Sequence, residues 1–126
     1  SGILAISLAQ LGTRTVWATD SDPVALDEAR KNILVNKVAH VIQLSDLPLE
    51  CLPTPFALIV ANLFSTTLIS LAPVLSSSIR PQGHAILSGI QIDQETEVVT
   101  AYPASDWHLS DRLARDEWVT LVLQRI

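Results

Sequence analysis

The chain has 126 residues, of which 48% are hydrophobic, and this is the size of one domain with a single core. Eight basic and thirteen acidic side chains give a net charge of −5, which disfavours a nucleic-acid partner because an acidic surface repels phosphate backbones. Cys51 is the only cysteine, and no apolar run has the length of a membrane span or the flanks of a signal peptide, so we expect a soluble, cytoplasmic protein without disulfides.

The apolar residues alternate between helical spacing and β-rich runs, which is typical of an α/β protein with a mostly parallel sheet. The first part of the chain predicts a helix at 3–11, a strand at 15–19, a helix at 23–35 and a strand at 40–44. In the second helix Leu26, Ala29 and Ile33 share an apolar face. Asp27 and Lys31 have the spacing of an ion pair on another face.

The run FALIVAN at 56–62 is continuously apolar and ends in a polar residue. This pattern predicts a strand that is buried on both faces and whose C-terminal end opens onto a site. A helix is expected at 65–79, and Pro73 should kink it or break it into two short pieces.

The last third of the chain predicts two further helical and β segments. Residues 80–89 are expected to form a turn, at Pro81–Gly83, that leads into a buried strand. A helix at 92–102 should follow, with Asp93 as its N-cap. The segment 107–125 contains two β-prone runs around a charged stretch, which predict an antiparallel hairpin at the edge of the sheet.

The chain opens on a helix with Gly2 in its first turn, where a sheet of this class normally opens with a strand. A helix start of this kind offers free backbone N–H groups and the positive end of the helix dipole to a ligand. Asp20 follows at about the spacing of 20 positions at which nucleotide-binding α/β proteins place a ribose-binding acid.

The turn DSDP contains two carboxylates with different expected roles. Asp22 directly precedes Pro23, which is the usual start of a helix, so Asp22 is expected to be the N-cap. Asp20 cannot cap the same helix, so its carboxylate is free to accept both hydroxyl protons of a ribose. A solvated turn residue is the alternative interpretation of Asp20.

Five segments together resemble the ribosomal protein L11 methyltransferase family: SGILAISLAQLG, ATDSDPVALDEARKNILVN, ALIVANLFSTTLISLAPVL, RPQGHAILSGI and DEWVTLVL. The resemblance runs over residues 1–126 and implies one Rossmann-like class I methyltransferase domain. It also implies that S-adenosylmethionine is the cofactor and that the substrate is a protein amino group, a lysine side chain or an α-amine, of a ribosomal protein. Similar sequences in mitochondria and chloroplasts methylate protein lysines, so an organellar location stays open for a eukaryotic source.

The sequence departs from the family pattern at its start. Only Ser1 and Gly2 match the family's glycine-rich loop, and the first strand of the sheet has no counterpart. The family's fold places that strand between the strands at 15–19 and 56–62. An N-terminal substrate-recognition domain also has no counterpart, so we expect the chain to be the C-terminal part of a longer protein.

Carried over residue by residue, the resemblance makes Asp20 the ribose acceptor, places the backbone of Ser21 beside the adenine, and makes Asn62 a contact of both cofactor and substrate. Gly2, at the helix start, is a further expected cofactor contact. An amide at the end of a strand can accept a hydrogen bond from the incoming amine and orient its lone pair, so Asn62 is the expected catalytic residue, with a strand-end turn as its alternative role. Asp46 is within expected reach of the adenine amino group, with the cap of a short turn as its alternative role.

Other polar and aromatic residues carry weaker signals. Trp118, next to Glu117 at the final strand, would wall the pocket or, as is more frequent for tryptophan, lie in the core. Methyl transfer is a direct displacement that needs no metal, and His40, His84 and His108 do not have the spacing of metal ligands.

Two other functions stay open from the sequence. A nicotinamide-dependent oxidoreductase shares the spacing from glycine to acid, but it normally ends in parallel strands. The second is a truncated domain without activity, kept as an interaction module. The expected partner is a protein substrate, with neither nucleic acid nor membrane.

Overall fold

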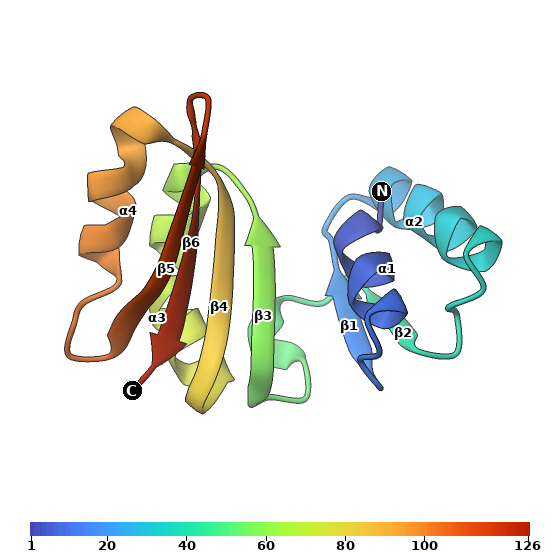
Figure 1. The fold of residues 1–126 in the computed structure, drawn as a ribbon. Coiled ribbons are helices and arrows are strands. Elements are labelled where there is room, and N and C mark those ends of the chain that lie inside the picture. The colour runs from blue at the N-terminus through green and yellow to red at the C-terminus, as the bar shows by residue number, and fades with distance from the viewer. The chain divides into compact units, whose positions relative to one another are not determined.

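The computed structural model describes residues 1–126, which form two compact units, Ser1–Leu52 and Pro53–Ile126 (Figure 1). Each unit has its own sheet, with two strands in the first and four in the second. None of the helices is both long enough and apolar enough to span a membrane.

The first unit consists of a small parallel sheet and two helices. Its elements are α1 (Ile3–Gln10), β1 (Val16–Thr19), α2 (Pro23–Val35), β2 (Ile42–Ser45) and the short 3-10 helix η1 (Leu49–Cys51). β1 and β2 run parallel, and α2 forms the crossover between them (Figure 1). The predicted order of helices and strands is confirmed, although β2 begins at Ile42 rather than at His40.

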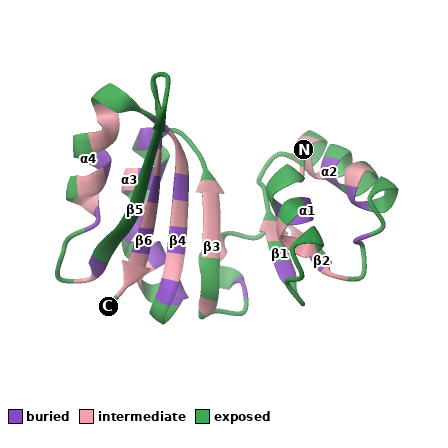
Figure 2. Ribbon diagram, viewed as in Figure 1, coloured by how far each residue is buried: buried purple, intermediate pink, exposed green.

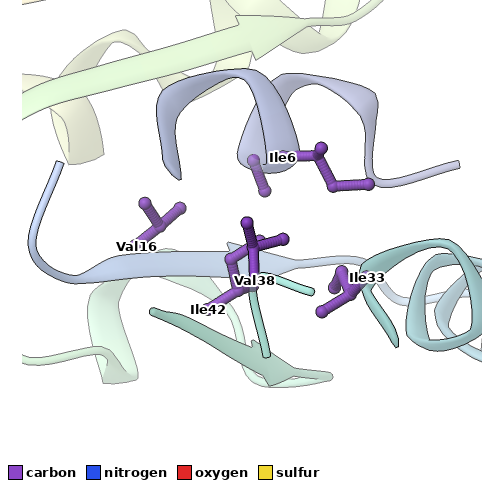
Figure 3. Packing of buried hydrophobic residues seen from close by; sticks show 6 residues of the cluster. Ile6, Val16, Ile33, Val38 and Ile42 are labelled. Carbon is purple, nitrogen blue, oxygen red and sulfur yellow. The ribbon is translucent and has the colours of Figure 1, made fainter. Parts of the chain in front are cut away.

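A small apolar core stabilises the first unit (Figure 3). Both helices and both strands contribute to it, through Ile6, Val16, Ile33 and Ile42, and the loop between α2 and β2 adds Val38. Ala29 and Ile33 are buried, which confirms the apolar face predicted for α2. Removing these side chains from water is what holds two short strands and two helices together.

The second unit consists of a mixed sheet with helices packed against it. Its elements are β3 (Phe56–Asn62), α3 (Ser65–Ser78), β4 (Ile79–Gln91), the 3-10 helix η2 (Ile92–Gln94), α4 (Glu95–Ala101), β5 (Trp107–Arg115) and β6 (Trp118–Arg125). The strand order is β3-β4-β6-β5. β3 and β4 are parallel, and β6 is antiparallel to both β4 and β5, so β6 alone runs in the opposite direction. The predicted C-terminal hairpin is therefore confirmed.

The core of the second unit lies where α3 and α4 meet the central strands β4 and β6 (Figure 2). Its fully buried side chains are Leu68, Leu75, Leu87, Ile90, Val98, Val119 and Leu121. Tyr102, just after α4, packs edge-on against Trp107 and donates a hydrogen bond from its hydroxyl to the carbonyl oxygen of Leu68 at 2.6 Å. Burial of the hydroxyl raises the pKa of Tyr102 above its usual range.

β3 is less buried than its apolar sequence predicts. Its residues are half-buried or exposed, and Leu58 retains 37% of its accessible surface. β3 is the edge strand of its sheet and pairs only with β4. The prediction of a strand buried on both faces is therefore wrong for this unit, because burial depends on neighbours that the strand's own sequence does not encode.

The predicted break of the helix at Pro73 and the predicted N-cap at Asp93 are both wrong. Pro73 lies inside α3 without breaking it, because proline removes a single N–H and the buried residues on either side, Ala72 and Leu75, stabilise the adjoining turns. α4 begins at Glu95 with Gln94 as its N-cap, and Asp93 lies in the preceding 3-10 helix. The side chain of Gln94 instead accepts a hydrogen bond from the Ser65 hydroxyl at 2.9 Å.

The turn predicted at 81–83 is an irregularity inside β4. β4 already pairs with β3 at Ile79, opposite Phe56, and the next paired residue, His84, lies opposite Leu58. The residues between them bulge from the strand, and Gln82 takes a positive φ of 69°. The prediction of a turn that precedes the strand is therefore wrong, because residues 81–83 belong to β4 and interrupt its pairing with β3.

Candidate functional site

A pocket in the first unit lies at the start of α1 and the C-terminal ends of β1 and β2. The residues that line it are Ser1, Gly2, Ala18, Thr19, Asp20, Ala25, Leu26, Ala29 and Leu44. Gly2 precedes α1 and Asp20 follows β1, and both were predicted from the sequence to contact the cofactor. The structure brings them together in this pocket. The remaining walls are largely apolar, with side chains from β1, α2 and β2.

Gly2 is required by the packing of the two helices. It takes a positive φ of 79°, and a Cβ atom at this position would lie 3.2 Å from the Cβ of Ala29 on α2. Its carbonyl oxygen accepts the first hydrogen bond of α1, from the N–H of Ile6 at 2.9 Å. The missing side chain therefore lets α1 begin against α2, and Gly2 lines the pocket with its backbone.

The two carboxylates of the DSDP turn have separate roles. Asp22 is the N-cap of α2, because its Oδ1 accepts from the N–H of Val24 at 2.9 Å and Pro23 occupies the first helical position. This confirms the predicted cap.

Asp20 is exposed, and its carboxylate is not wholly free as expected. Oδ1 accepts a hydrogen bond from the N–H of Asp22 at 2.9 Å, whereas Oδ2 makes no hydrogen bond within the chain. Because each carboxylate oxygen has two lone pairs and only one is used, Asp20 can still accept hydrogen bonds from both hydroxyls of a ribose.

Ser21 and Asp46 are exposed and do not line the pocket. Asp46 nevertheless follows β2 as Asp20 follows β1, and the N–H of Asp20 donates to the carbonyl oxygen of Ser45 at 3.2 Å. Both carboxylates therefore leave neighbouring strands at the same edge. The alternative role of Asp46 as a turn cap is taken by Ser45, whose hydroxyl oxygen accepts from the N–H of Leu47 at 3.0 Å.

Asn62 is the last residue of β3, in the second unit, and is exposed. It pairs with Ser88 of β4, and the next residue, Leu63, donates its N–H to the carbonyl oxygen of Ser88 at 3.2 Å. The side-chain amide of Asn62 makes no hydrogen bond within the chain. Both its donor and its acceptor are therefore available to a ligand.

Gly89 is a residue of this region that sequence reasoning missed. A Cβ atom at Gly89 would lie 2.6 Å from Oδ1 of Asn62 and 2.8 Å from the carbonyl oxygen of Leu63. The sequence contains a signal that points to it, since a glycine inside a strand marks a bulge or a close approach of another group.

Trp118 does not lie in the core. It begins β6 with 48% of its surface exposed, because the strand alternates and turns the next residue, Val119, inward. Glu117 lies in the hairpin turn, where its carbonyl oxygen accepts from the N–H of Ile92 at 2.9 Å.

The pocket of the first unit has the chemistry of a nucleoside site. A carboxylate at the end of a parallel strand can accept hydrogen bonds from a ribose, and apolar side chains such as Leu26 and Leu44 can cover an adenine ring. The start of α1 adds backbone groups to the same pocket. These residues fit the adenosine part of a cofactor.

Comparison with known proteins identifies close sequence relatives. The family model described as ribosomal protein L11 methyltransferase matches residues 1–126. The chain is 38% identical over 130 residues to the ribosomal protein L11 methyltransferase of Chelativorans sp. (strain BNC1), covering 99% of this chain and 45% of that protein. It is 40% identical over 124 residues to that of Thiobacillus denitrificans, covering 97% of this chain and 40% of that protein. The chain thus spans less than half the length of these curated relatives.

Solved structures are similar over nearly the whole chain. The ribosomal protein L11 methylase of Lactobacillus delbrueckii subsp. bulgaricus matches with a TM-score of 0.92 and 30% identity, over 98% of this chain and 64% of that chain. A methyltransferase from Pyrococcus furiosus matches with a TM-score of 0.79 and 15% identity, over 99% and 69%, and shows the fold alone. The predicted α/β, Rossmann-like methyltransferase fold is confirmed.

Proposed function

The chain belongs to the ribosomal protein L11 methyltransferase family, and from this premise we propose that it is part of an S-adenosylmethionine-dependent methyltransferase acting on amino groups of ribosomal protein L11. The observation that carries the proposal is the match of the family model to all of residues 1–126. The proposal assigns these residues to one catalytic domain and the protein to the cytoplasm, where ribosomal proteins are made. No direct contact with nucleic acid or membrane is proposed.

In this proposal the pocket of the first unit binds the adenosine part of the cofactor. Asp20 accepts hydrogen bonds from the ribose hydroxyls, and its unbonded Oδ2 supports this role. Gly2 contributes its backbone at the start of α1, while Ser21 and Asp46 lie next to the adenine. S-adenosylmethionine supplies an electrophilic methyl group on its sulfonium sulfur.

Asn62 is proposed to bind the amine that receives the methyl group, and to contact the cofactor. Its Oδ1 would accept a hydrogen bond from a neutral amine and so direct the nitrogen lone pair along the line of displacement. The exposed, unbonded amide at a strand end supports this assignment. The protein then needs no covalent nucleophile, because holding the neutral amine in line supplies the catalytic advantage.

The oxidoreductase alternative is less well supported. An enzyme of that type normally ends in parallel strands, whereas β6 runs antiparallel between β4 and β5. The family match favours the methyltransferase as well.

The test is to titrate the complete protein with S-adenosylmethionine and with NAD in a calorimeter, and to follow transfer of a radiolabelled methyl group to purified L11. Binding of S-adenosylmethionine together with labelling of L11 is the expected result. L11 with a blocked α-amine and L11 with its lysines replaced by arginine separate the two kinds of amino group. Binding of NAD alone would establish the oxidoreductase, and absence of both binding and labelling would establish a domain without this activity.

A further inference from the structure

We propose that Gly89 is a positioning residue for Asn62, because the absence of a side chain at residue 89 lets the amide that binds the substrate amine lie where it does. This inference rests on the proposed role of Asn62 in methyl transfer. It assigns a catalytic purpose to a residue that touches neither cofactor nor substrate in the proposal.

The first observation is a bulge in β4 next to the end of β3. Leu87 pairs with Leu121 and Ile90 pairs with Val119, so Ser88 and Gly89 together stand opposite the single residue Thr120. Gly89 takes a positive φ of 83°, which is the conformation that a bulge with glycine requires. The extra residue bends the backbone of β4 at the level where β3 ends.

The second observation is that the bulge meets the side chain of Asn62. The position that a Cβ atom of residue 89 would take lies 2.6 Å from Oδ1 of Asn62, and this space exists only because residue 89 is glycine. Asn62 has no hydrogen bond within the chain to hold its amide. The glycine therefore leaves open the place that Oδ1 takes, and a side chain at residue 89 would meet both this oxygen and the carbonyl oxygen of Leu63, 2.8 Å from the same position.

The size of the clash predicts the size of the effect. Restoring an ordinary van der Waals contact would move Oδ1 by about 1 Å, and a misplacement of about 1 Å can reduce a rate by about 100-fold when in-line geometry is needed. The pocket proposed for the adenosine part of the cofactor is lined by other residues, all in the first unit. Gly89→Ala should therefore reduce turnover far more than it weakens the binding of S-adenosylmethionine.

The experiment compares Gly89→Ala with the wild-type complete protein, using kcat and KM for L11 methylation and the Kd of S-adenosylmethionine. A fall in kcat of about 100-fold with a much smaller change in Kd is expected. Gly12→Ala is the matched control, because Gly12 also has a positive φ, 100°, but a Cβ atom there would meet nothing within 4 Å. It shares the backbone strain without the contact and should keep the wild-type kcat.

A double-mutant cycle separates positioning from a general structural effect. If Gly89 acts through Asn62, Gly89→Ala should change kcat by no more than about two-fold in a protein that already carries Asn62→Ala. The same loss in both backgrounds, or no loss in the wild-type background, would overturn the positioning role. A wild-type protein that methylates no L11 would overturn the proposed function and this inference with it.

A measurement on the unmodified protein covers the case in which Gly89→Ala does not fold. NMR relaxation of the Asn62 side-chain amide should show an ordered group in the absence of substrate. An order parameter below about 0.6 would show that the amide moves freely beside Gly89, and would refute the proposal.

Discussion

The carboxylate of Asp20 accepts a hydrogen bond from the backbone N–H of Asp22 at 2.9 Å, so the proposed ribose acceptor and the cap of α2 are parts of one turn. The backbone N–H of Asp22 orients the carboxylate of Asp20. The carboxylate of Asp22 in turn caps α2 by accepting a hydrogen bond from the N–H of Val24. This explains why a short turn contains two aspartates. It also means that variants must be chosen to separate ligand binding from turn geometry.

Asp20→Asn should weaken binding of S-adenosylmethionine while leaving the turn intact. The amide oxygen of asparagine can still accept from the N–H of Asp22, but the charged acceptor for the ribose is lost. The expected loss is about 1.5–3 kcal/mol for each hydrogen bond to the carboxylate, measured by calorimetry. Asp20→Ala removes both functions and should also lower the melting temperature. Unchanged affinity in both variants would remove the ribose assignment.

Asp22→Ala should lower the stability of the protein without weakening its binding of S-adenosylmethionine. Removing an N-cap side chain costs about 1 kcal/mol of unfolding free energy, whereas the N–H that orients Asp20 remains in place. Denaturant unfolding should report the loss, and the Kd of S-adenosylmethionine should stay close to that of the wild type. A stability equal to that of the wild type would contradict the importance of the cap.

Asn62→Asp should make methyl transfer dependent on pH. A carboxylate accepts a hydrogen bond as an amide does, but it also favours the protonated amine, which has no lone pair to attack with. Transfer to L11 should therefore fall at neutral pH and recover in part as the pH rises. Asn62→Ala adds no charge and should lose activity equally across the series, so a normal rate for Asn62→Asp at neutral pH would refute the mechanism.

The ion pair between Glu95 and Arg112 should stabilise the second unit except at acid pH. Two hydrogen bonds of 2.5 and 2.7 Å join the guanidinium on β5 to the carboxylate at the start of α4, and they hold the pKa of Glu95 below its usual value. The contribution is complete above the ordinary pKa of a glutamate and is lost as the pH falls through the lowered pKa.

Thermal melts at several pH values test this pair. Arg112→Gln should lower the melting temperature at neutral pH, and the difference from the wild type should disappear at acid pH. Lys31→Gln is the control, since it removes the exposed pair with Asp27, whose atoms are 3.2 Å apart on the surface of α2. Equal changes in melting temperature for the two substitutions would show that the pair of Arg112 with Glu95 stabilises the protein no more than an exposed surface pair does.

Features that depend on local sequence could be predicted. The cap at Asp22, the apolar face of α2 and the alternation of helices and strands follow from residues that lie close together in the chain. The hairpin of β5 and β6 was predicted for the same reason, because two β-prone runs flank a short turn. In each case the residues that determine the feature are neighbours in the sequence.

Features that depend on distant segments could not be predicted. The exposure of β3 follows from its place at a sheet edge, and the contact between Asn62 and Gly89 exists only in the register that joins β3 to β4. The hydrogen bond from the N–H of Asp22 to Oδ1 of Asp20 joins residues close in the chain. The sequence DSDP is equally compatible with a carboxylate that makes no such bond, so this contact could not be predicted either. The residues expected at the cofactor remain predictions until ligand binding is measured.

The position of β6 between β4 and β5 determines the order in which the second unit can assemble. β5 has β6 as its only partner, and pairs such as His84 with Gln124 close a long loop, which slows their formation. During synthesis β5 must therefore wait for a strand that leaves the ribosome after it. Until then the backbone from Trp107 to Arg115 is unpaired, and the charged side chains Asp111, Arg112 and Arg115 oppose its pairing with other chains.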